Sequence, residues 1–142
     1  MSRIAVVKTL FVLITGGLAA VSGVQFYQHR HHQLSIVAGP GVTRVTDLSK
    51  YGAELKGTMA DTKVFFLEGK EPGGKALVMA NTHANEPDGI LAALIFIENA
   101  VVEKGTLLII PQLDHSASRY TRPGDGYPFF YEIPTAWGTK KF

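Results

Sequence analysis

The stretch from Lys75 to Ala117, KALVMANTHANEPDGILAALIFIENAVVEKGTLLIIPQLDHSA, decides the fold of this chain of 142 residues. It begins with the apolar run 76–80 (ALVMA), which is typical of a strand covered on both faces. Apolar residues then recur at helical spacing, at Ile90, Ala93, Leu94, Ile97 and Val101. The run 106–113 (TLLIIPQL) predicts a second buried strand. Strand, helix and strand within about forty residues indicate a βαβ unit, whose crossover is right-handed.

This pattern predicts an α/β domain with a mostly parallel sheet. The run 64–67 (VFFL) is a further short β-prone segment ahead of the unit. We assign Glu98, Asn99 and Glu103 to the solvent side of the helix, and Gly105 to its C-terminal stop. In an open parallel sheet ligands bind at the carboxyl ends of the strands, so the residues that follow each strand are candidates for a functional site.

The composition fits one globular domain and excludes several classes of protein. Because the chain has no cysteine, it contains neither disulfides nor a zinc site built on thiolates. The formal net charge is +2 and no dense Lys/Arg stripe occurs, so we expect no nucleic-acid partner. Residues 119–142 combine Pro and Gly with many aromatic residues, which predicts loops whose aromatic side chains need a covering surface.

The N-terminal segment has the layout of a targeting sequence. Residues 9–24 carry no charge, and Arg3 and Lys8 precede them. This pattern predicts a hydrophobic helix that is either a cleaved signal peptide or a signal-anchor, and that spans a bilayer if Lys8 extends to the interface. The alternative is a buried core helix, which Gly16 and Gly17 disfavour. Either targeting role places the rest of the chain on the extracytoplasmic side, membrane-anchored or exported.

A histidine-rich run, His29-Arg30-His31-His32, follows the apolar segment. One interpretation is a metal site of a metal-handling membrane protein. The other is a solvated linker beside the membrane, since nothing nearby in the sequence fixes the imidazoles in place. We therefore divide the chain into residues 1–33, a signal or anchor with its linker, and residues 34–142, a domain with a modest core.

His83 and Glu86 lie between the first buried strand and the helix. Pro87 suits the first helical position and keeps the residue before it out of the α region, which places Glu86 at the N-cap. An imidazole and a carboxylate at a strand terminus can share a zinc ion that activates a bound water. The alternatives are a surface hydrogen-bond pair, or a capping role for Glu86 that needs no metal.

The segment from Lys75 to Ala117 resembles the succinylglutamate desuccinylase/aspartoacylase family of the zinc carboxypeptidase superfamily. The resemblance is carried by His-x-Asn-Glu-Pro-x-Gly at residues 83–89 and by Pro-x-Leu-x-x-Ser-Ala at residues 111–117. It implies that His83 and Glu86 bind zinc, and that residues 34–142 are part of a zinc-carboxypeptidase-like domain. It also implies hydrolysis of an amide bond by zinc-activated water, in an N-acyl amino acid or a peptide that carries a carboxylate.

The family pattern also points to residues that contact the substrate. It usually has Asn-Pro in the turn after the second strand, followed by an arginine that binds a substrate carboxylate. Here Asp114 and His115 occupy the Asn-Pro positions, and the charge of Asp114 repels an anionic substrate. Arg119 or Arg122 can supply the bidentate carboxylate contact, and the alternative for each is a solvated loop charge.

Two parts of the family's site have no counterpart in this sequence. The family's third zinc ligand is a histidine much further along, and its general base is a late glutamate. His115 is the last histidine here, and it is a candidate third ligand because it follows the neighbouring strand. We expect the chain to be the N-terminal portion of a longer hydrolase. The alternative is a catalytically inactive fragment or degenerate relative that at most binds metal or a partner.

Overall fold

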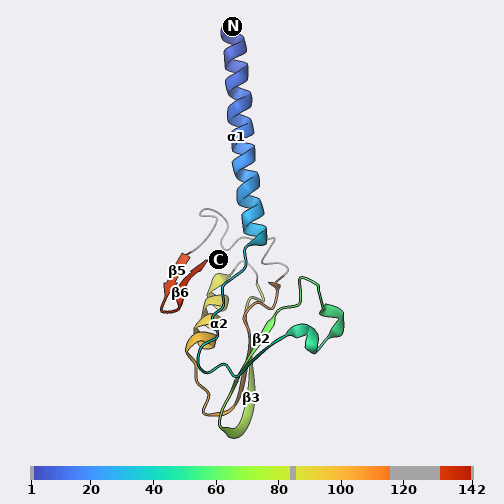
Figure 1. The fold of residues 1–142 in the computed structure, drawn as a ribbon, viewed down its shortest axis with the longest axis vertical. Helices are drawn as coiled ribbons and strands as arrows, with labels where there is room; N and C mark the ends of the chain where they lie inside the picture. Colours follow the sequence, from blue (N-terminus) through green and yellow to red (C-terminus); the bar gives the residue numbers. More distant parts are fainter. Residues whose placement is uncertain (1, 84–85, 116–131, 142) are drawn as a thin grey trace. The chain divides into compact units, whose positions relative to one another are not determined.

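The computed structural model describes residues 2–83, 86–115 and 132–141. The chain forms two compact units, Met1–His32 and Gln33–Phe142. The first unit contains the helix α1 (Arg3–His31). The second contains, in chain order, β1 (Arg44–Asp47), the short 3-10 helices η1 (Leu48–Lys50) and η2 (Ala53–Leu55), β2 (Lys63–Glu68), β3 (Glu71–Met79), α2 (Pro87–Asn99), β4 (Lys104–Ile110), β5 (Glu132–Thr135) and β6 (Gly138–Lys141) (Figure 1).

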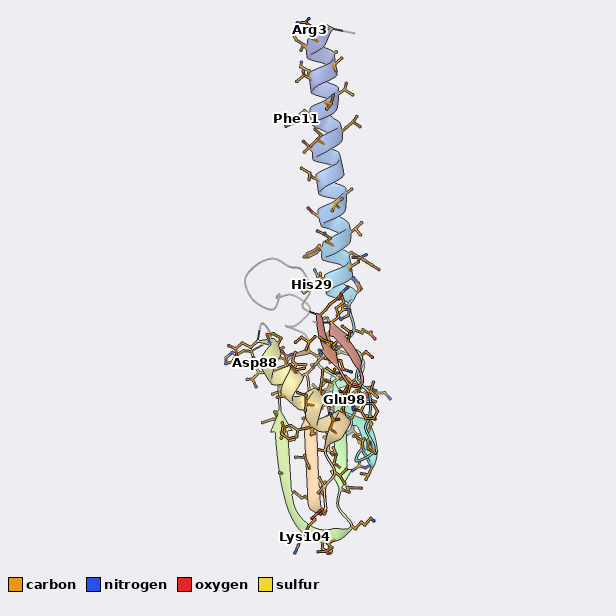
Figure 2. All side chains as sticks on the ribbon, turned by 90° about the vertical axis from the view of Figure 1, so that its left-hand side faces the viewer. Arg3, Phe11, His29, Asp88, Glu98 and Lys104 are labelled. Carbon is orange, nitrogen blue, oxygen red and sulfur yellow. The ribbon has the colours of Figure 1, made fainter. Side chains whose placement is uncertain are left out.

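The helix α1 confirms the predicted N-terminal hydrophobic helix. Its N-terminus is capped by the hydroxyl of Ser2, which accepts a hydrogen bond from the N–H of Ala5 at 3.2 Å. The most apolar window of α1 has a mean hydropathy of 2.2 and none of it is buried. Its side chains project outward all round the helix (Figure 2). By length and composition α1 can cross a membrane, and a signal sequence near an N-terminus has the same properties.

The main sheet has the strand order β1-β2-β4-β3. The strands β3 and β4 run parallel, with Leu77 opposite Leu108, and α2 joins them, so the predicted βαβ unit is confirmed. The prediction of a mostly parallel sheet is wrong, because β2 pairs antiparallel with both β1 and β4. Only Gly69 and Lys70 link β2 to β3. Such a link is too short for a parallel crossover, so β2 runs opposite to β3 and β4.

Both faces of the sheet carry a hydrophobic cluster. The face under α2 packs through Phe65, Leu67, Ile109, Ala93 and Ile97. On the other face Val64, Phe66 and Ile110 pack with Leu48 and Leu113. Figure 1 shows α2 lying along the sheet, which fixes the ends of β3 and β4 beside the first turn of the helix.

The strand β3 is an edge strand, and the prediction that it is covered on both faces is wrong. Among the described residues it pairs with β4 alone. The exposed fractions of Leu77 and Met79 are 52% and 54%. A continuous apolar run does not by itself show whether both faces of a strand are covered, because exposed and covered strands can carry the same apolar run.

The helix α2 ends earlier than its apolar pattern predicts. It stops at Asn99, and Val101 lies beyond it with 68% of its surface exposed. Gly105, predicted as the helix stop, belongs to β4 instead and has a φ of +84°. A Cβ atom at this position would stand 2.2 Å from the carbonyl oxygen of Gly74. Glycine is therefore required here by the close approach of β3 to β4.

The strands β5 and β6 form an antiparallel hairpin, with Ile133 opposite Lys140. The prediction of loops over residues 119–142 is therefore wrong for residues 132–141, while residues 116–131 lie outside the described part of the chain. The indole N–H of Trp137 donates to the side-chain oxygen of Asn99 on α2 at 3.0 Å. Ile133 packs against the cluster of Ile90 and Leu94. The hairpin therefore packs against α2.

The assignment of Glu98 to the solvent side of α2 is wrong, because its carboxylate forms a buried ion pair with the ammonium group of Lys140 on β6. Both side chains are 1% exposed. Lys140 also donates to the backbone carbonyl of Ser35 at 3.2 Å. One buried ammonium group thus joins α2, the C-terminal hairpin and the segment that precedes β1. Helical spacing alone cannot reveal such a partner, which lies about forty residues away in sequence.

The variant Lys140→Met should destabilise the domain by about 3–5 kcal/mol, because it leaves the Glu98 carboxylate buried without a counter-charge. Adding Glu98→Leu should restore most of the loss, and urea unfolding of the full chain measures both changes. The control is Lys63→Met, because Lys63 forms an exposed ion pair with Asp47. This variant should lower the free energy of unfolding by less than about 1 kcal/mol. If the single and the double variant lose the same free energy of unfolding, the loss comes from packing and not from the unpaired charge of Glu98.

Candidate functional site

The carboxyl ends of β3 and β4 lie side by side and are joined by backbone hydrogen bonds. The N–H of Ala80 donates to the carbonyl of Ile110, and the N–H of Leu113 donates to the carbonyl of Ala80, both at 2.9 Å. One residue further on, the N–H of Asp114 donates to the carbonyl of Asn81 at 3.2 Å. The two loops that follow the strands are therefore held together at the sheet end where the sequence predicts a site.

Asn81 begins the loop after β3 and was not identified from the sequence. It has a φ of +63°, a left-handed conformation that Asn tolerates better than most residues. Its amide nitrogen donates to the carbonyl of Asp114 at 3.2 Å, and the residue is 3% exposed. Because the nitrogen must face that carbonyl, the side-chain oxygen is left over, and it meets no hydrogen-bond donor among the described residues. A buried acceptor without a partner is uncommon and is typical of functional sites.

His83 and Glu86 lie on one tight turn that follows Asn81. The N–H of Glu86 donates to the carbonyl of His83 at 3.1 Å and closes this turn. Both residues line a cleft of about 180 Å³, together with Asn81 and the first turn of α2 at Asp88 and Gly89. The structure therefore brings together the two residues that the sequence singles out as metal ligands.

Glu86 is the N-cap residue of α2, in an extended conformation, and Pro87 is the first helical residue, as predicted. The side chain of Glu86 makes no capping hydrogen bond. The interpretation that capping alone explains Glu86 therefore loses its main support. The N-terminus of α2 carries a partial positive charge, which favours a carboxylate at this position.

His83 and Glu86 carry side chains of the types that ligate zinc. An imidazole nitrogen and a carboxylate oxygen are both common zinc ligands. Among the described residues, no group of three His, Cys, Asp or Glu side chains is placed to hold a metal ion. Arg119 and Arg122, the predicted substrate contacts, lie outside the described residues.

His115, the candidate third ligand, lines a different cavity. Its Nδ1–H donates to the carbonyl of Met59 at 3.1 Å, and its side chain lines a cavity of about 510 Å³. The lining of the smaller cleft includes His83 but not His115. Asp114 precedes His115 in the chain and is bonded to Asn81 at the smaller cleft. Its backbone N–H donates to the carbonyl of Asn81, and its carbonyl accepts from the side-chain amide of Asn81. His115 follows the strand beside β3, so the sequence placed it at the same sheet end as His83. The structure places it in the lining of the larger cavity instead.

Asp61 lines the same larger cavity. The backbone N–H of Ser49 donates to its Oδ1 at 2.8 Å, and this hydrogen bond holds the pKa of the Asp61 carboxyl below its usual value. The carboxylate thereby joins η1 to the segment that leads into β2.

No family model, curated protein or solved structure matches this chain. The smaller cleft is lined by His83 and Glu86, beside Asn81 with its buried acceptor and the N-terminus of α2. Such a set can bind a cation and orient a polar ligand next to it.

The variant Asn81→Ala should destabilise the domain by about 1 kcal/mol more than Asn81→Gly, because alanine resists a positive φ and glycine does not. Both variants lose the hydrogen bond to Asp114, so the difference between them isolates the backbone conformation. Thermal or urea unfolding of the two variants measures it. Equal stabilities would contradict a left-handed residue at this turn.

Replacing Asp61 with asparagine should lower the melting temperature slightly at pH 7 and not at acid pH. A lowered folded-state pKa stabilises the fold above the ordinary aspartate value of about 3.9, and this contribution disappears as the pH falls through the folded-state pKa. Melting curves of wild type and Asp61→Asn between pH 7 and pH 2 should therefore converge in acid. A difference that stays constant over this range would show that the ionised carboxylate contributes nothing.

Proposed function

We propose that this chain carries metal ligands of a zinc-dependent hydrolase of amide bonds, membrane-anchored or exported through α1. The proposal takes its substrate class, an N-acyl amino acid or a peptide with a carboxylate, from the resemblance to the succinylglutamate desuccinylase/aspartoacylase family. One observation carries it: His83 and Glu86 line the same cleft at the end of β3, and the carboxylate of Glu86 is not used for capping.

Each residue of the cleft has a distinct task in this proposal. His83 and Glu86 would hold the metal, and the hydrogen bond from the N–H of Glu86 to the carbonyl of His83 limits the distance between their backbones. Zinc, when bound, polarises a carbonyl group and makes water a good nucleophile near neutral pH. Asn81 positions the loop by fixing its first residue to the turn after β4. A loop fastened to two paired strands holds its ligands more precisely than a free loop does.

The substrate contacts of this proposal come from residues that follow β4 in the sequence. Arg119 or Arg122 binds a substrate carboxylate through paired hydrogen bonds. Asp114 occupies the position where the family has a neutral asparagine, and its carboxylate disfavours a second negative charge on the substrate. The proposal therefore favours substrates with one carboxylate over those with two.

Zinc titration of the full chain tests the metal ligands. His29, His31 and His32 are first replaced by asparagine in every sample, so that the histidine-rich run cannot contribute. In this background His83→Ala and Glu86→Ala should each weaken zinc binding by about tenfold or more, because each removes a ligand. The control His115→Ala should leave the affinity unchanged, since His115 lies in the other cavity.

Unchanged zinc affinity in His83→Ala would overturn this assignment. Loss of all binding on replacing the histidine-rich run would move the metal site to the linker. Zinc binding that depends on His83 and Glu86, without turnover of any N-acyl amino acid or peptide, would favour the inactive relative that binds only metal.

A further inference from the structure

The larger cavity, of about 510 Å³, has an apolar wall and a polar end. Its apolar lining consists of Leu34, Ile36, Ala38, Val45 and Phe65. Val45 and Phe65 face each other on the neighbouring strands β1 and β2. Cavities of about 300–1,000 Å³ with mostly apolar walls and a few polar groups are typical of small-molecule sites.

The polar end of this cavity lies at the sheet end that carries His83 and Glu86. Asp61 and Thr62 precede β2, while Gln112 and His115 follow β4. Because β2 and β4 are antiparallel, the start of one strand lies beside the end of the other. The turn that contains Leu113 and Asp114, which is bonded to Ala80 and Asn81, connects this end to the smaller cleft.

The charged groups at the cavity are already engaged by other parts of the domain. The ammonium group of Lys63 lies 2.5 Å from Oδ1 of Asp47. Asp61 accepts the N–H of Ser49 at 2.8 Å. The neutral hydrogen-bonding groups of Gln112 and Thr62 remain at this end, and they can donate hydrogen bonds to an amide and accept them from it.

The remaining wall is the segment that follows α1 in the chain. Leu34 and Ile36 pack against the cluster of Ile90 and Leu94 on α2. Leu34 is the third residue after His31, the last residue of α1. Three residues span at most about 11 Å, so chain connectivity keeps this wall close to the end of the helix that can cross a membrane. A short covalent link therefore joins the cavity wall to a helix that can cross a membrane, which favours a ligand drawn from a membrane.

We propose that this cavity binds the acyl chain of a single-chain amphiphile taken from the membrane surface, with its amide at the polar end. The proposal rests on the proposed function, because it makes the substrate an N-acyl amino acid with a long acyl chain. The apolar wall then selects chain length. The polar end of this cavity and the cleft of His83 and Glu86 are separate, and the turn at residues 113–114, which is bonded to Ala80 and Asn81, lies between them in the chain.

Photolabelling of the full chain in phosphatidylcholine nanodiscs tests this assignment. The probe is N-palmitoylglycine with a diazirine near the end of its acyl chain, and labelled peptides are identified by mass spectrometry. Labels should appear on residues 34–38 and on Val45 or Phe65, and not only on α1. Ala38→Trp fills the cavity and should reduce this labelling several-fold. The control Val101→Trp, at an exposed position outside the cavity, should not.

Two outcomes would overturn the acyl site. One is labelling confined to α1 in the wild-type chain, a result that needs no variant and so does not depend on how well Ala38→Trp folds. The other is labelling of residues 34–38 that a folded Ala38→Trp variant leaves unchanged.

The variant His83→Ala separates this inference from the proposed function. The cavity does not include His83, so labelling of residues 34–38 should persist in this variant. Persistent labelling together with zinc affinity that ignores His83 would reject the hydrolase and retain the acyl site. Zinc binding through His83 and Glu86 without cavity labelling would reject the acyl site and retain the hydrolase.

Discussion

The parallel pairing of β3 with β4 is the interaction on which the rest of the domain depends. It needs a crossover of suitable length, which α2 supplies, and a close approach of the two chains, which Gly105 permits. The pairing continues past the strands as hydrogen bonds between Ala80, Asn81 and the turn at residues 113–114. These bonds fix the start of the loop that carries His83 and Glu86. The candidate site is thus a direct product of this strand pair.

A second constraint holds the outer side of α2. The buried pair of Glu98 and Lys140 joins the helix to the C-terminal hairpin, and the bond from Lys140 to Ser35 adds the segment before β1. A buried ion pair contributes modestly to net stability, but losing one partner is costly, so it strongly specifies which elements pack together. The same contacts hold the segment whose residues 34, 36 and 38 line the larger cavity. The contact between Lys140 and Ser35 therefore helps to position one wall of the larger cavity.

The sequence predicted the elements near the site better than those around it. The order of strand, helix and strand, the N-cap at Glu86 and the first-turn position of Pro87 follow from local rules, and the structure agrees with them. The antiparallel pairing of β2, the exposed edge of β3 and the hairpin of β5 and β6 were not predicted. Each depends on which segments meet in space. Asn81 was missed for the same reason, since its importance comes from the carbonyl of Asp114, thirty-three residues away.

By itself, the sequence determined the apolar N-terminal helix, the βαβ unit and the placing of His83 and Glu86 between the strand and the helix, because these features depend on residues a few positions apart. Only the tertiary structure decided that Glu98 is buried, that His115 lies in a different cavity from His83, and that the segment after α1 lines that cavity. A local pattern fixes which way a side chain leaves its own helix or strand. The partner it then meets is set by packing across the whole domain, and no spacing rule encodes that partner.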